Sequence, residues 1–165
     1  MVTQIVIGVV VLALLIYRQL RTRPVNASGL RIVAIIGAIG LVETYQFLRQ
    51  HHAGAVTYAA LLGSLALAAG FGVLRAVTVR IWLQDGQPWS RGSWITAGLW
   101  IVALAVHLGY DALVAGPGRD NVGAASIVLY LAVSLAIQRM IVRLRAQRLQ
   151  SRSDRNSDRL GALRR

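Results

Sequence analysis

The chain has 165 residues, of which 56% are hydrophobic, and its mean hydropathy of +0.57 is far above that of a soluble domain of this size. All 18 basic residues are arginines, and the formal net charge is +12. The absence of cysteine excludes thiol–disulfide exchange, iron–sulfur ligation and thioether-linked haem on this chain. We therefore expect one small membrane domain whose arginines meet anionic lipid headgroups rather than nucleic acid.

Five apolar segments follow one another along the chain, each close to the ~20 residues that a helix needs to cross the hydrocarbon core. They cover residues 2–20, 30–48, 54–74, 94–113 and 122–142. This pattern predicts an all-α membrane protein, a bundle of about five transmembrane helices within residues 1–146. No basic residue precedes the first segment, so it is expected to stay in the mature protein rather than to be cleaved as a signal peptide.

The arginines predict the orientation, because basic residues concentrate in cytoplasmic loops. With the N-terminus outside and the C-terminus in the cytoplasm, four arginines of the first loop, three of the third and nine at the C-terminal end lie inside. Only Arg49 and Arg119 then lie outside. This partition fits an odd number of spans and predicts a multi-pass protein of the cell membrane.

The third apolar segment carries small residues at a spacing of four. They are Ala60, Ser64, Ala68 and Gly72. Such a ridge lets a neighbouring helix approach closely, which is how membrane helices gain packing energy. Internal packing is the first interpretation, and the interface of a homodimer is the alternative.

The segment from Ala76 to Ile95 differs from the rest, since apolar and polar residues alternate up to an Asp85-Gly86 pair that is typical of a tight turn. This pattern predicts a short cytoplasmic β-hairpin between the third and fourth helices. The alternative is an interfacial continuation of the third helix, with its tryptophans as headgroup anchors.

Ionisable residues inside membrane spans are costly and tend to face a partner or a water-filled cavity. Glu43 and His107 lie at matching depth, about 8–9 Å below the outer boundary by the rise per residue. With their helical neighbours they define a candidate outward-facing polar pocket. Its members are Glu43, Gln46, Tyr58, His107, Asp111 and Tyr130. The pocket would bind a ligand or handle protons, whereas the alternative is a closed structural ion pair.

Bis-histidine haem ligation within one chain is disfavoured, because His51 and His52 lie about 12 Å or more above His107 by the rise per residue. Single axial ligation and a site shared across a dimer are the alternatives. We expect neither a cofactor nor a metal. The tail over residues 147–165 is rich in arginine, serine and aspartate and is expected to be disordered in water. A partly helical, lipid-bound tail is the alternative.

Two stretches resemble the CcdC-like family of small bacterial membrane proteins. They are YRQLRTRP over residues 17–24, and GVLRAVTVRIW over residues 72–82 followed by Asp85-Gly86, the latter similar to actinobacterial members. The resemblance covers roughly the first two thirds of the chain and implies an association with cytochrome c maturation. It supplies no catalytic residue, and without cysteine such a role would be indirect.

These observations predict a small non-enzymatic membrane protein, either an accessory or assembly factor or a subunit of a larger complex. One alternative is a membrane-embedded enzyme or ligand-binding protein that uses the pocket around Glu43 and His107. Another is a transport subunit, which is disfavoured because five short spans leave little room for broken, repeated helices. The expected partners are the bilayer, anionic headgroups on the cytoplasmic face, and another protein or a second copy of the chain.

Overall fold

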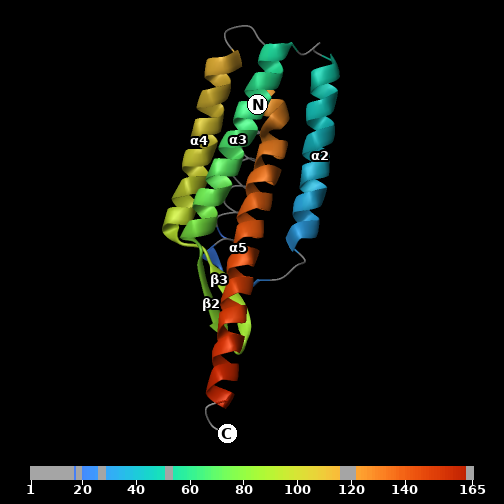
Figure 1. Ribbon diagram of the computed structural model, residues 1–165. Helices are drawn as coiled ribbons and strands as arrows, with labels where there is room; N and C mark the ends of the chain where they lie inside the picture. Colours follow the sequence, from blue (N-terminus) through green and yellow to red (C-terminus); the bar gives the residue numbers. More distant parts are fainter. Residues whose placement is uncertain (1–16, 18–19, 26–28, 51–53, 116–121, 163–165) are drawn as a thin grey trace.

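The computed structural model describes residues 17, 20–25, 29–50, 54–115 and 122–162. In this part of the chain, long helices form a bundle with a small antiparallel sheet at one end, which we call the sheet end (Figure 1). The helices are α2 (Gly29–Gln50), α3 (Ala55–Thr78), α4 (Trp94–Ala115) and α5 (Val122–Ala162). The strands are β1 (Arg23–Pro24), β2 (Arg80–Gln84) and β3 (Gln87–Arg91).

All four of these helices are long and apolar enough to cross a membrane. The candidate spans are Arg31–Gln50, Ala55–Thr78, Trp94–Val114 and Ser126–Ser153, close to four of the five predicted segments. The first predicted segment, residues 2–20, lies outside the described residues apart from Tyr17 and Leu20. The described chain is therefore a mostly helical, multi-pass membrane protein with four long apolar helices where five had been expected.

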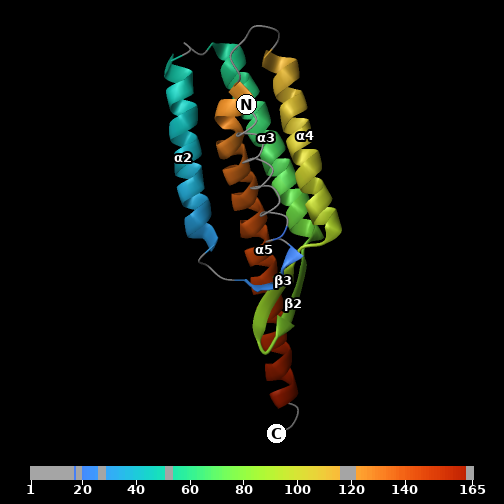
Figure 2. The ribbon, with the colours of Figure 1, turned by 180° about the vertical axis from the view of Figure 1, so that it is seen from behind.

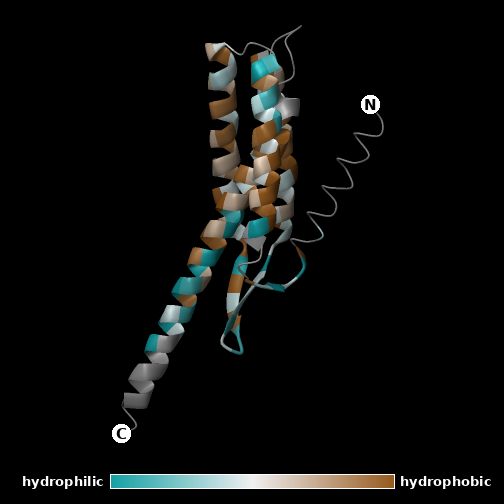
Figure 3. Ribbon diagram, turned by 90° about the vertical axis from the view of Figure 1, so that its right-hand side faces the viewer, coloured by the Kyte–Doolittle hydropathy of each residue, from teal (hydrophilic) through white to brown (hydrophobic). Residues whose placement is uncertain are grey.

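Helices α2 and α4 lie on opposite flanks of the bundle, with α3 and α5 between them (Figures 1 and 2). Helix α2 packs on α5, while α4 packs mainly on α3 and makes a smaller contact with α5. The apolar residues that face outward on α2 and α4 suit contact with lipid. Figure 3 shows mostly hydrophobic residues along the bundle, with hydrophilic residues at the sheet end and also at the opposite end.

Small residues set the closest helix contacts. A Cβ added to Gly40 of α2 would lie 2.5 Å from the backbone nitrogen of Leu129 in α5. A Cβ added to Gly72 of α3 would lie 2.7 Å from the carbonyl oxygen of Ser134 in α5. The four ridge residues expected on α3 are all among its buried residues, so the ridge lies inside this chain.

Helix α5 has 41 residues and is therefore about 60 Å long, twice the hydrocarbon thickness of a bilayer. Its second half passes beside the sheet and beyond it (Figure 3). Residues 147–162, for which disorder in water had been expected, belong to this helix in the structure, in line with the helical alternative. A boundary between residues 146 and 147 stays a prediction, since α5 passes through it without a break.

The predicted hairpin is confirmed: β2 and β3 pair antiparallel around Asp85 and Gly86, which have φ values of 53° and 72°. Positive φ at both central residues matches the twist of the strands, and Asp-Gly tolerates it. The alternative of a continuous helix is wrong, because α3 ends at Thr78 and Val79 is extended. Alternation had been expected from Val77, yet α3 includes that residue. The pairing of β1 with β3 was not foreseen.

Candidate functional site

Polar side chains are buried where α3, α4 and α5 meet, and we call this group the polar core. They recur at intervals of four or seven residues on α4 and α5, so each helix presents them on one face. The polar core consists of Ser64, Arg75, Thr96, Trp100, His107, Ser126, Tyr130 and Ser134. All of them are at most 4% exposed, so their chemistry depends on one another rather than on solvent.

His107 occupies the half of the polar core away from the sheet, and 1% of it is exposed. Its ring stacks on Tyr130 with a centroid separation of 4.3 Å and an interplanar angle of 30°. Its Nδ1 lies 3.2 Å from the hydroxyl of Ser64, within hydrogen-bond distance. The Tyr130 hydroxyl donates to the carbonyl of Ala103 at 3.2 Å. Three helices thus meet here through polar contacts.

Arg75 lies nearer the sheet and is fully buried. Its guanidinium carbon lies 3.8 Å from the centroid of the Trp100 ring, a cation–π contact, and its Nη2 donates to the Ser134 hydroxyl. Among the described residues, Nε and Nη1 of Arg75 and Nε1 of Trp100 have no hydrogen-bond acceptor. A buried guanidinium usually faces a carboxylate. In this arrangement an aromatic face and a hydroxyl take that place.

Two sets of contacts fix the sheet end of the bundle. Ser93 and Thr96 bind each other reciprocally at the start of α4, with the Ser93 amide donating to the Thr96 hydroxyl at 3.1 Å. Arg145 of α5 donates to the carbonyls of Ala76 at 2.5 Å and of Val79 at 3.2 Å. These carbonyls end α3 and lack helical partners, so Arg145 satisfies them and ties α3 to α5.

The structure brings together only some of the predicted pocket residues. His107 and Tyr130 are in contact, but Glu43 and Gln46 are exposed on α2. Tyr58 is 50% exposed, and the side chain of Asp111 is not among those that the structure describes.

The expected pair of Glu43 and His107 is not formed. It required α2 and α4 to be neighbours, and they lie on opposite flanks of the bundle (Figures 1 and 2). Equal depth in the membrane does not decide whether two helices are neighbours, so it could not predict this contact.

Sequence reasoning missed the burial of Arg75. The residue had been counted with the loop arginines that report orientation, because it directly follows the apolar segment over residues 54–74. The sequence signal that could have indicated a buried arginine was the presence of Trp100 and Ser134, an aromatic ring and a hydroxyl, within other spans.

The hairpin presents a second group of residues, which we call the basic aromatic face. Residues directly opposite each other in β2 and β3 share one face of the sheet. The three pairs on this face are Arg80 with Arg91, Trp82 with Trp89, and Gln84 with Gln87. The sequence RIWLQDGQPWSR is therefore palindromic around its turn at these positions.

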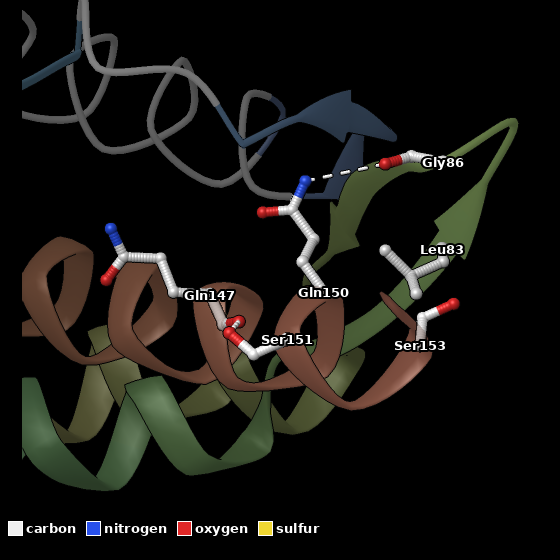
Figure 4. A pocket seen from close by; sticks show the side chains of 6 residues that line it. All are labelled: Leu83, Gly86, Gln147, Gln150, Ser151 and Ser153. Carbon is white, nitrogen blue, oxygen red and sulfur yellow. Dashed lines mark hydrogen bonds between the residues drawn. The ribbon is translucent and has the colours of Figure 1, made fainter. Parts of the chain in front are cut away.

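The opposite face of the hairpin is turned toward α5. Leu83 lines a pocket of about 580 Å³ between the hairpin and α5, together with Gln147 and Gln150 (Figure 4). Gln150 Nε2 donates to the carbonyl of Gly86 at 3.4 Å. Because Leu83 faces α5, the basic aromatic face is directed away from α5.

Comparison with known proteins finds a distant similarity to "Uncharacterized protein YxjN" of Bacillus subtilis (strain 168), 31% identical over 99 residues. The aligned region covers 60% of this chain and 63% of that relative. No family model and no solved structure matches the chain. The chain is thus a small multi-pass membrane protein with a bacterial relative, whose printed name gives no activity, and the CcdC-like resemblance stays a prediction.

Proposed function

We propose that this protein is a non-enzymatic accessory or assembly factor of the cell membrane. It would hold a fixed platform against the cytoplasmic side of the bilayer. We call β1, β2, β3 and residues 145–155 of α5 the sheet platform. The observation that carries the proposal is the attachment of α5 to the end of α3 by Arg145 and to the hairpin turn by Gln150. A two-stranded hairpin is marginal by itself, so contacts from α5 fix its position relative to the membrane.

The distribution of arginines supports a cytoplasmic location for the sheet platform. Arg80, Arg91, Arg148 and Arg152 all belong to it, and Arg49 lies at the opposite end of the bundle. Basic residues are retained on the cytoplasmic side during membrane insertion. Reporter fusions at Gln87 and at the C-terminus should both report the cytoplasm, and an external signal from either would contradict this orientation.

The accessory role can be tested in native membranes. On native gels, the wild-type chain is expected to migrate in a complex larger than a homo-oligomer of the chain. Arg145→Gln removes the contacts that tie α5 to the end of α3, directly before the hairpin, and should release the protein from the complex while leaving its abundance unchanged. Arg143→Gln, an exposed arginine two residues away, is the matched control and should stay in the complex. A wild-type chain found only by itself would overturn the proposal.

The resemblance to the CcdC-like family supports c-type cytochrome maturation as the process that this factor assists. Deletion of the gene should then lower the amount of haem-stained c-type cytochrome, and a plasmid copy should restore it. Since the chain has no cysteine, deletion should act on the yield of maturation rather than on thiol reduction. Unchanged cytochrome levels would remove this assignment without affecting the accessory role.

The contact of Ser64, His107 and Tyr130 supports a second candidate, a membrane-embedded binding protein. The Ser64 hydroxyl lies 3.2 Å from Nδ1 of His107, and the ring centroids of His107 and Tyr130 lie 4.3 Å apart, so polar groups from three helices meet there. If this group binds a ligand, Tyr130→Phe should abolish function in a protein that still assembles at wild-type levels. Full function in that variant would leave the cluster with a packing role.

A further inference from the structure

Arg80 and Arg91 are direct cross-strand partners at the base of the hairpin, and both are exposed. Like charges in this position repel each other and destabilise the strand pair. The next rungs on the same face are the tryptophan and glutamine pairs, which carry no charge. Asp85 is exposed in the turn at the far end of the hairpin. The described residues of this face therefore leave the arginine pair without a carboxylate.

The chain places this pair at the membrane boundary. Arg80 follows Thr78, the last residue of one candidate span, by two residues, and Arg91 precedes Trp94, the first residue of another, by three. At ~3.3 Å per strand residue, both arginines start within about 10 Å of the ends of the spans. Trp94 itself is 79% exposed, as suits a side chain at headgroup level.

We infer that Arg80 and Arg91 clamp the phosphate of an anionic phospholipid, with Trp82 and Trp89 beside it in the interface. A phosphate between two guanidinium groups accepts charge-assisted, bidentate hydrogen bonds and removes their repulsion. Tryptophan prefers the headgroup region because its ring is apolar while its N–H needs a polar partner. The bilayer supplies the occupant, since both strands leave it within a few residues. The inference rests on the spans and the strand register, and is independent of the accessory role.

Lipid binding by the full chain tests this clamp. The protein in a neutral detergent is titrated with phosphatidylglycerol and with phosphatidylcholine, and the bound lipid is counted by native mass spectrometry. Arg80→Gln and Arg91→Gln are each expected to lower the preference for phosphatidylglycerol about fivefold, because each removes one of the two guanidinium groups that donate charge-assisted hydrogen bonds to the phosphate. Arg31→Gln, also exposed at the sheet end, removes the same charge from α2 and should change the preference less than twofold.

Equal losses in all three variants would show diffuse attraction and overturn the clamp, as would no loss in any of them. Because the clamp needs both arginines, the double variant should lose little more than either single one. Independent fivefold losses that multiply would contradict a shared phosphate.

Thermal stability supplies a second test, because an arginine pair that binds no lipid would not make the stability depend on phosphatidylglycerol. In neutral detergent at low salt, Arg80→Gln should raise the melting temperature, because the cross-strand repulsion disappears. With phosphatidylglycerol present, the same variant should gain less stability from the lipid than the wild type does. The same stability measurement is repeated with inorganic phosphate in place of the lipid. If phosphate stabilises the wild type as well as the lipid does, the site takes a free anion and the lipid assignment fails.

Discussion

The two flanking helices are attached to the bundle in different ways. Helix α2 meets α5 through a glycine contact so close that a methyl group on Gly40 would reach the backbone of Leu129. Helix α4 instead contributes Trp100 and His107 to the polar core, where both are 1% exposed. In lipid, apolar surface alone gives no drive for helices to associate. Close backbone packing and buried polar contacts are two separate solutions, and this protein uses one on each flank.

The difference teaches which substitutions each flank should tolerate. At the α2–α5 contact the backbone atoms cannot move aside, so added volume is harmful while polarity matters little. In the polar core, many substitutions conserve volume, but each one that removes a hydrogen-bonding group leaves a buried polar group without its partner. The following predictions test this contrast, from the largest expected effect to the smallest.

Arg75→Ala should have the largest effect. The substitution removes the contact with Trp100 and leaves an empty space in the centre of the bundle. We expect the free energy of unfolding to fall by about 2–4 kcal/mol, measured by denaturation in mixed micelles.

Arg75→Met serves as the control for volume. A thioether chain fills most of the space without a buried charge, and such replacements are often neutral. Its stability should lie within about 1 kcal/mol of wild type if packing dominates. A loss as large as that of Arg75→Ala would show that the guanidinium itself holds α4 in place.

Gly40→Ala should weaken the other flank. Because its Cβ would lie 2.5 Å from Leu129 N, 2.8 Å from Leu129 Cα and 2.9 Å from Val128 C, the helices must separate. We expect a loss of about 1–3 kcal/mol in the same denaturation experiment. Gly70→Ala is the matched control, since nothing lies within 4 Å of its added Cβ, and it should not destabilise. Equal stabilities of the two variants would contradict the close contact.

His107→Phe should have a smaller effect, because phenylalanine preserves the ring stack on Tyr130 while it loses the contact with Ser64. The expected loss is about 1 kcal/mol. In a double-mutant cycle with Ser64→Ala, the two losses should be less than additive, since both remove one interaction. Additive losses would mean that the 3.2 Å approach contributes nothing to stability.

Local patterns in the sequence were sufficient to predict much of this fold. The alternation before Asp85-Gly86 identified the hairpin because strand period and turn chemistry are both short-range signals. Hydropathy located the four described helices for the same reason. The spacing of small residues located the buried ridge of α3, which includes Ser64 and Gly72.

The missing part is the arrangement of helices around one another. Depth can be estimated from the position of a residue in its span, which is how Glu43 and His107 came to be expected at comparable depth. Which helices are neighbours depends on tertiary packing, such as the contact of Gly40 with α5. Hydropathy does not predict this packing. The burial of Arg75 was missed for a related reason, because an arginine near the end of a span is ordinarily a cytoplasmic marker.

The smallest effect on the stability of the helix bundle is expected at the turn of the hairpin, which joins α3 to α4. Gly86 has a φ of 72°, and an L-residue there costs about 1–2 kcal/mol, so Gly86→Ala should loosen the hairpin. Because the strands lie outside the candidate spans, the loss should remain local. Hydrogen exchange should quicken at the backbone amides that pair β2 with β3, while those of α2 stay unchanged. Gly98→Ala, in α4 with nothing within 4 Å, is the control and should leave both regions protected. Faster exchange in α2 as well would show that the hairpin supports the whole bundle, and that the two flanks are not independent.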